Sequence, residues 1–330
     1  MRELPNCSIA TLQRLVTPND KPQHILRNIF ICRSKTIKVD CIKKENLAMF
    51  NLFRKKMYQK WCSPRVPHLL VVGYPKVGNT WFGVMLRRML VSAYGIPEKQ
   101  WSFALDADVQ KQHEVPRVQM THTMPKFNTQ SASQLDVRTG LAKNSRLIFL
   151  MRDPRDTLVS LYFDKSFRSQ RFCGSLDAMI RDPVYGVEKL LKFYCAWDAA
   201  WCESDDQIMV RYEALHQNPL SMMKNTWAFA RLAQLSSDQL QEAIAFGRFD
   251  NMRRIEVDCQ IQQGWLRKKE DVTRAEGLKT RCGRIGQYAE YMEPATLQYV
   301  ESCLDALPER FKVVAQASSE FSLFDHRCAV

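Results

Sequence analysis

The chain has 330 residues, of which 45% are hydrophobic and 25% are charged, and this composition supplies enough apolar residues for a large folded core. The net charge is +13, but residues 1–66 hold 14 basic against 4 acidic residues, so the rest of the chain is only slightly basic. No run of 18 apolar residues occurs, which excludes a predicted membrane-spanning helix. The 11 cysteines form no Cys-x-x-Cys pair, so neither a zinc site nor a disulfide framework is expected.

Residues 1–66 are interpreted as a basic N-terminal extension without an assigned role, and residues 67–330 as the main domain. Within the extension only a helix over 44–61 is expected. Basic segments can bind nucleic acid, acidic membranes or anionic ligands, or remain solvated. The acid-poor composition is compatible with a transit peptide, whereas the missing secretory apolar core and the odd number of cysteines favour a cytoplasmic protein. We expect no nucleic-acid partner, and the sequence leaves the oligomeric state open.

The most informative stretch of the chain is a short apolar run that leads into a loop with glycines. Residues 69–73 predict a buried strand, and an apolar pattern of helical period starts at Thr80. Such a strand, loop and helix start can bind phosphate, because loop amides and the helix dipole point at the anion. Gly73 and Gly78 are spaced as in the Walker A loop, but the lysine lies inside the loop, at Lys76.

Short apolar strands alternate with helices along the rest of the chain. This alternation predicts an α/β fold, with a P-loop-like three-layer α/β/α architecture around a mostly parallel central sheet. Further strands are expected at 117–121, 147–151 and 207–211, helices at 131–143, 155–166, 187–203, 218–232, 236–245 and 294–307, and an irregular stretch at 257–287.

Polar side chains follow each predicted strand. Lys76, His122, Arg152 and Tyr212 should gather at one edge of the sheet, where ligands bind in such folds. Arg152 could hold a second anion, because a guanidinium group matches a phosphate. His122 could act as a general base, although a single histidine is more often structural. The strand over 147–151 does not end in the carboxylate with which an NTPase holds magnesium.

Several short motifs occur in a fixed order along residues 66–290. They are Tyr-Pro-Lys-Val-Gly-Asn-Thr-Trp at 74–81, Met-Thr-His at 120–122, Arg-Asp-Pro-Arg-Asp at 152–156 with Ser160, Tyr-Glu at 212–213, Phe-Asp-Asn-Met at 249–252 and Arg-Cys-Gly-Arg-Ile-Gly at 281–286. In this order they resemble the sulfotransferases that depend on 3′-phosphoadenosine 5′-phosphosulfate (PAPS), in particular the cytosolic type. The resemblance implies that residues 67–330 form a sulfotransferase domain.

The resemblance implies PAPS as the co-substrate, 3′-phosphoadenosine 5′-phosphate (PAP) as the product, a small organic acceptor, and no metal requirement. It implies that Lys76 stabilises the leaving phosphate and that His122 takes the proton of an acceptor hydroxyl or amine. Together with Ser160, these are the implied catalytic residues. The residues implied to bind the nucleotide are Lys76, Val77, Gly78, Asn79, Thr80, Trp81, Arg152, Ser160, Tyr212, Phe249, Arg281, Cys282 and Gly283.

Several positions depart from the family pattern and indicate a divergent member. Met120 and Cys282 stand where the family has lysines, and Asn79 replaces a loop threonine. The dimerisation motif of animal cytosolic members is not visible after Gly286.

Two other readings remain open from the sequence. One is a P-loop nucleotide kinase or NTPase, and the other is a pseudoenzyme that binds PAP without turnover. The sequence does not identify the acceptor substrate, but aromatic residues in variable loops would suit an apolar acceptor. These residues are Phe103, Phe127, Phe163, Phe167, Phe172 and Trp265.

Overall fold

The computed structural model describes residues 68–97, 107–201, 206–258, 266, 272 and 274–312, which all belong to the unit Arg65–Val330. The basic extension with its expected helix over 44–61, and the aromatic residues Phe103 and Trp265, lie outside the described residues.

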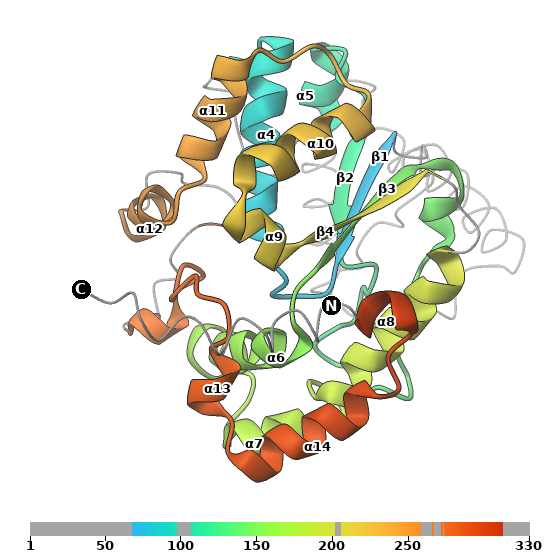
Figure 1. The fold of residues 1–330 in the computed structure, drawn as a ribbon, viewed down its shortest axis with the longest axis vertical. Coiled ribbons are helices and arrows are strands. Elements are labelled where there is room, and N and C mark those ends of the chain that lie inside the picture. The colour runs from blue at the N-terminus through green and yellow to red at the C-terminus, as the bar shows by residue number, and fades with distance from the viewer. Residues whose placement is uncertain are drawn as a thin grey trace, which may run out of the picture. The chain divides into compact units, whose positions relative to one another are not determined.

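A four-stranded sheet, in which every neighbouring pair is parallel, forms the centre of the domain (Figure 1). The strand order is β2-β1-β3-β4. All residues of β1 are buried, as expected for an apolar run in a sheet that is covered on both faces. The four predicted strands are confirmed to within one residue. The strands are β1 (Leu69–Gly73), β2 (Val118–Thr121), β3 (Arg146–Met151) and β4 (Gln207–Arg211).

Helices cover both faces of this sheet, so the three-layer α/β/α prediction is confirmed (Figure 1). The chain moves from β1 to β2 in one direction and from β3 to β4 in the other. Right-handed crossovers therefore place the connecting helices on opposite faces. One layer contains α4 (Asn79–Tyr94), α10 (Pro219–Ala230) and α11 (Ser237–Phe246); the other contains α6 (Pro154–Phe163), α8 (Val187–Trp201) and α14 (Pro294–Leu304).

Shorter elements connect these layers. Four of the α-helices among them, α7, α9, α12 and α13, were not expected from the sequence. The short elements are α5 (Ala107–Gln112), a 3₁₀ helix (Gly140–Asn144), a π-helix (Asp164–Arg168), α7 (Leu176–Ile180), α9 (Tyr212–Gln217), α12 (Phe249–Val257), a second 3₁₀ helix (Ala275–Gly277) and α13 (Tyr288–Tyr291).

The helix expected over 131–143 is wrong, because this stretch forms turns and then a short 3₁₀ helix. Its backbone forms turn hydrogen bonds within the stretch, such as Leu135 to Ala132, and also bonds to distant segments. The amide of Ala132 donates to the carbonyl of Pro183 at 2.6 Å, and the amide of Arg138 donates to the carbonyl of Thr123 at 3.0 Å. Each backbone amide has one hydrogen to donate, so an amide that bonds to a distant carbonyl does not form the bond that a helix requires.

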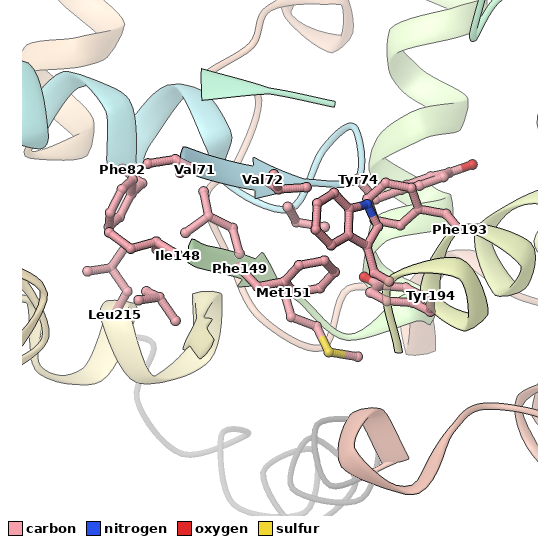
Figure 2. Close-up of a cluster of buried hydrophobic side chains, with 14 of the residues drawn as sticks. Val71, Val72, Tyr74, Phe82, Ile148, Phe149, Met151, Phe193, Tyr194 and Leu215 are labelled. Atoms are coloured by element: carbon pink, nitrogen blue, oxygen red, sulfur yellow. The ribbon is translucent and has the colours of Figure 1, made fainter. Parts of the chain in front are cut away.

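The core fixes the strand ends from which the site is built (Figure 2). Alternating side chains of neighbouring strands enter opposite layers. Val71 and Ile148 lie beside Phe82 in one layer, while Phe149 lies among the rings of α8 in the other. Each of these side chains is at most 1% exposed, and burying one such group stabilises the fold by roughly 1.5–3 kcal/mol. The described helices include none with the length and apolar character needed to cross a bilayer.

Candidate active site

A cavity of about 1010 Å³ lies at the carboxyl ends of β1 and β3, between which the strand order reverses. All the predicted site residues except one line it. Val77 is the exception, since its side chain is 2% exposed and packs in the core. The lining includes Lys76, Gly78, Asn79, Thr80, Trp81, His122, Arg152, Ser160, Tyr212, Phe249, Arg281, Cys282 and Gly283.

The loop between β1 and α4 presents the start of a long helix to the cavity. Gly78 caps α4 with a φ of 96°, which is left-handed, and a β-carbon there would come within 2.8 Å of the Tyr212 ring. Asn79 closes the loop by donating from Nδ2 to the carbonyl of Tyr74 at 2.8 Å. No acidic residue occupies the first turn of α4, so its positive end is free to attract an anion.

Lys76 forms an ion pair that the sequence did not indicate. Its Nζ lies 3.3 Å from Oδ1 of Asp164, whose other carboxylate oxygen is 3.2 Å from Nζ of Lys165. Burial opposes ionisation of Asp164, but the two lysines outweigh it and hold its pKa well below the usual value. The cavity therefore holds one carboxylate directly beside the lysine of the loop.

His122 is oriented by a backbone carbonyl at the end of the neighbouring strand β1. Its Nδ1 is 2.7 Å from the carbonyl of Gly73, and because a carbonyl only accepts, Nδ1 carries the hydrogen. Nε2 then remains without a partner among the described side chains. Burial lowers the pKa of His122, the bond to Gly73 opposes this, and Lys279, Lys165 and Lys76 lower the pKa further. His122 is thus neutral at pH 7, with one nitrogen able to accept a proton.

Arg152 connects the end of β3 to a late loop of the chain. Its Nη2 donates to the carbonyl of Arg284 at 2.9 Å and lies 3.3 Å from Asp156. Asp156 also accepts from the amides of Gly286 at 2.8 Å and Tyr288 at 3.0 Å. The carboxylate therefore holds residues 281–288 against α6, which brings Arg281 to the cavity wall.

The other charged residues of this motif are structural. Asp153 caps α6 by accepting from the amide of Arg155 at 2.8 Å, and its carboxylate pairs with the Arg155 side chain, also at 2.8 Å. Glu213 accepts from the amide of Asp153 at 2.9 Å. These bonds join the ends of β3 and β4, so the Tyr-Glu pair places Tyr212 beside Arg152, whose guanidinium carbon is 4.4 Å from the ring centroid.

Three aromatic residues, Trp81, Tyr212 and Phe249, border one end of the cavity, and we call them the aromatic slot. The rings of Trp81 and Tyr212 meet edge to face at 5.4 Å. Phe249 at the start of α12 is 41% exposed, whereas the other phenylalanines in the described part of the chain are buried or half-buried. Gly283 packs so closely on Phe249 that a β-carbon would lie 2.7 Å from the ring.

The predicted acceptor aromatics lie mostly elsewhere. Phe127 is on the cavity wall, but Phe163, Phe167 and Phe172 are not among its lining residues. Phe163 and Phe167 stack on each other at 5.6 Å, and Phe172 contacts Tyr185 at 6.3 Å. These three rings therefore pack against other aromatic side chains, and their prediction as acceptor contacts is not supported by the cavity lining.

Sequence reasoning also missed polar residues of the cavity wall. They lie in the π-helix, in the short helix α9 and in turns, and none of them belongs to a motif or directly follows a predicted strand. These residues are Asp164, Lys165, Arg171, His216, Arg248 and Lys279. Over the described ranges, no three His, Cys, Asp or Glu side chains gather in a way that could hold a metal ion.

Comparisons with known proteins agree with this geometry. The family model of the sulfotransferase domain matches residues 66–312. Cytosolic sulfotransferase 17 of Arabidopsis thaliana is 20% identical over 299 residues, which cover 79% of each chain. Cytosolic sulfotransferase 16 of the same plant is 22% identical over 283 residues, covering 75% of this chain and 77% of that protein.

Among solved structures, mouse sulfotransferase SULT7A1, crystallised with PAP, superposes with a TM-score of 0.54 at 17% identity. The match covers 78% of this chain and 89% of the mouse chain, and it supports the fold. Because the family model spans most of the chain and includes every predicted site residue, the protein belongs to the sulfotransferase family.

Proposed function

We propose that the protein transfers the sulfonate group of PAPS to a hydroxyl or amine of a small organic acceptor. The observation that carries this proposal is the meeting of three features in one cavity. They are the loop with Lys76, a second cationic site at Arg152 and Ser160, and a neutral His122 whose Nε2 is available.

The cavity suits an adenine nucleotide with two phosphate positions. The amides at the start of α4 and the Thr80 hydroxyl would hold the 5′-phosphosulfate. Arg152, Ser160 and Arg281 would hold the 3′-phosphate, and the aromatic slot would stack on adenine. Stacking of a base on an aromatic side chain contributes about 1–3 kcal/mol. The volume lies at the upper end of the usual range of ligand pockets, about 300–1,000 Å³, which leaves room for an acceptor beside the nucleotide.

The transfer step uses residues that face this space. His122 accepts the acceptor proton at Nε2 as the acceptor oxygen or nitrogen bonds to sulfur. The bond between sulfur and the bridging oxygen breaks, and its electron pair stays on the phosphate of PAP. Lys76 stabilises this growing negative charge. For this, its ammonium group leaves the ion pair with Asp164 and contacts the nucleotide instead. Charge stabilisation by preorganised groups is usually the largest contribution to the rate.

Turnover of labelled PAPS over a panel of phenols, alcohols and amines tests the proposal. We expect transfer to at least one acceptor and a roughly 10²–10⁴-fold loss of kcat in His122→Ala, because a positioned base contributes about this factor. His122→Ala should keep its affinity for PAP. An undiminished variant would remove His122 from the mechanism, and PAP binding without any turnover would indicate a pseudoenzyme.

A kinase or NTPase is the competing enzyme class. Thermal unfolding with PAP, and separately with ATP and magnesium, distinguishes the two. Stabilisation by ATP and magnesium alone would contradict a sulfotransferase. A cytoplasmic location, which the names of the plant relatives state for those proteins, is part of the proposal and can be checked by fluorescent tagging.

A further inference from the structure

Lys279 is a cation of the cavity wall without an anionic partner. It is half-buried and lines the same cavity as Lys76 and His122. No hydrogen bond or ion pair of its ammonium group exists among the described residues. Lys76, by contrast, pairs with Asp164, and Lys165 pairs with Asp164 and with Asn128 at 2.9 Å.

The backbone of Lys279 is held by a buried carboxylate. Glu256 of α12 is 0% exposed and accepts from the amide of Lys279 at 2.8 Å, the amide of Thr280 at 2.9 Å and the Thr280 hydroxyl at 2.8 Å. Arg168 of the π-helix completes the set by donating to Glu256 at 2.8 Å and to the Gly277 carbonyl at 3.1 Å. Four bonds to one carboxylate therefore fix the turn that directs Lys279 to the cavity.

The electrostatic surroundings place Lys279 near the two groups proposed to flank the reacting sulfur. Burial first, and then the positive charges of Lys76 and Arg168, lower the pKa of Lys279 to about 7, against the opposing effect of Asp164 and Glu256. Lys279 is also the leading cation in lowering the pKa of His122, ahead of Lys165 and Lys76. A bound anion between them would relieve this repulsion.

Met120, an uncharged residue, stands at a second position that bears on the charge of the cavity. It stands where the resembling family has a lysine, two residues before His122. Its side chain does not line the cavity, and its Sδ lies 3.7 Å from Nη2 of Arg87, beside Gly83 of α4. The side chain at this position is thus apolar here and is directed toward α4 instead of into the cavity.

We propose that Lys279 is a catalytic residue that contacts the sulfonate group and supplies the charge that Met120 cannot. This inference rests on the proposed function. The ammonium group of Lys279 donates to a sulfonate oxygen while the sulfonate group passes from the phosphate of PAPS to the acceptor. The proton of the acceptor hydroxyl or amine passes to His122. The cation comes from the loop after α12 instead of from the sheet.

The test compares PAPS, which carries the sulfonate, with PAP, which lacks it. Binding of each is measured by calorimetry without acceptor, for the unaltered protein, Lys279→Gln, Lys279→Arg and the control Lys224→Gln, an exposed lysine of α10. In Lys279→Gln we expect PAPS binding to weaken about tenfold more than PAP binding, the effect of one charge-assisted hydrogen bond. The kcat should fall about 10²-fold, as when one donor to the transition state is removed.

Lys279→Arg should keep most of the difference between the two nucleotides, and Lys224→Gln should keep all of it. The difference in PAPS affinity between Lys279→Gln and the unaltered protein should become smaller as the pH rises from 6.5 to 9, because Lys279 of the unaltered protein then loses its charge. Equal weakening of PAPS and PAP, an unchanged kcat, or an effect only on the KM of an anionic acceptor would each overturn the inference. If the unaltered protein binds neither nucleotide, the proposed function falls, and this inference with it.

Discussion

At the scale of single residues, the site depends on how burial and neighbouring cations set the state of His122. Three lysines lie close enough to disfavour its protonation, and the carbonyl of Gly73 fixes its tautomer. The imidazole is therefore prepared as a base without the carboxylate that often orients a catalytic histidine. The same lysines that attract an anionic substrate also keep the base neutral.

The pH dependence of kcat/KM follows from this arrangement. Because the pKa of free His122 lies below 6.5, the decline of kcat/KM toward acid pH should begin only below pH 6.5, separate from any alkaline decline caused by deprotonation of Lys279, whose pKa is about 7. Initial rates between pH 4.5 and 8 would show it. An acid limb centred above pH 6.5 would contradict the neutral state of His122.

Asp164 gives a second prediction at this scale. Its negative charge lies 3.3 Å from Lys76, where an anionic nucleotide would bind. Removing the charge in Asp164→Asn should strengthen PAP binding several-fold, because Lys76 no longer exchanges partners and a repulsion is lost. Calorimetry measures the change, with the exposed Asp136→Asn as control. Weaker binding would mean that Asp164 chiefly positions Lys76.

At the scale of elements, buried carboxylates hold the loops that carry the site. Asp156 joins α6 to the loop before α13, and Glu256 joins α12 to the turn with Lys279. Each satisfies several donors at once, which makes a buried charge tolerable. The described loop residues 279–288 are therefore held by bonds to distant carboxylates and not by a pattern of their own.

Glu256→Gln should destabilise the fold by about 3–5 kcal/mol, the usual cost of breaking a buried ion pair from one side. Urea unfolding measures this, with the exposed Glu276→Gln as control. A loss below about 1 kcal/mol would show that water replaces the carboxylate.

The contribution of Glu256 should also depend on pH. Burial opposes its ionisation, but the Lys279 and Thr280 amides, the Thr280 hydroxyl and Arg168 lower its pKa below 4.5 in the folded state. The stabilisation is therefore complete above pH 4.5 and is lost as the pH falls through the folded pKa. The difference between Glu256→Gln and the unaltered protein should narrow over that acidic range.

At the scale of the whole molecule, the site belongs to one part of the chain. All the lining residues fall within 66–312, and we propose that residues 67–330 form the sulfotransferase domain, with 1–66 as an extension. A chain that starts at residue 65 should then unfold cooperatively. At 100 times its Kd, PAP should stabilise it by about 2.7 kcal/mol, as for the full chain. Loss of this stabilisation would assign residues 1–66 to the fold or to the site.

The sequence by itself determined the parts of this protein that depend on local pattern. Continuous apolar runs predicted β1 and β3, because a parallel sheet buries both faces of a strand. The loop with Lys76, and the residues His122 and Arg152, could be recognised because they directly follow β1, β2 and β3. Once the strands are parallel, their ends must meet, so most of the cavity wall was predictable.

The tertiary structure alone decided which side chains complete that wall. Lys279 and Asp164 line it from a turn and from a π-helix, and Glu256, which holds the Lys279 backbone, lies buried in a helix that the sequence did not predict. They reach their places through long-range bonds, such as Glu256 to Lys279 across 23 residues and Lys76 to Asp164 across 88. The turns over 131–143 replaced an expected helix for the same reason. A local pattern records which residues could be buried together, whereas partners distant in sequence determine where an irregular backbone points its charges.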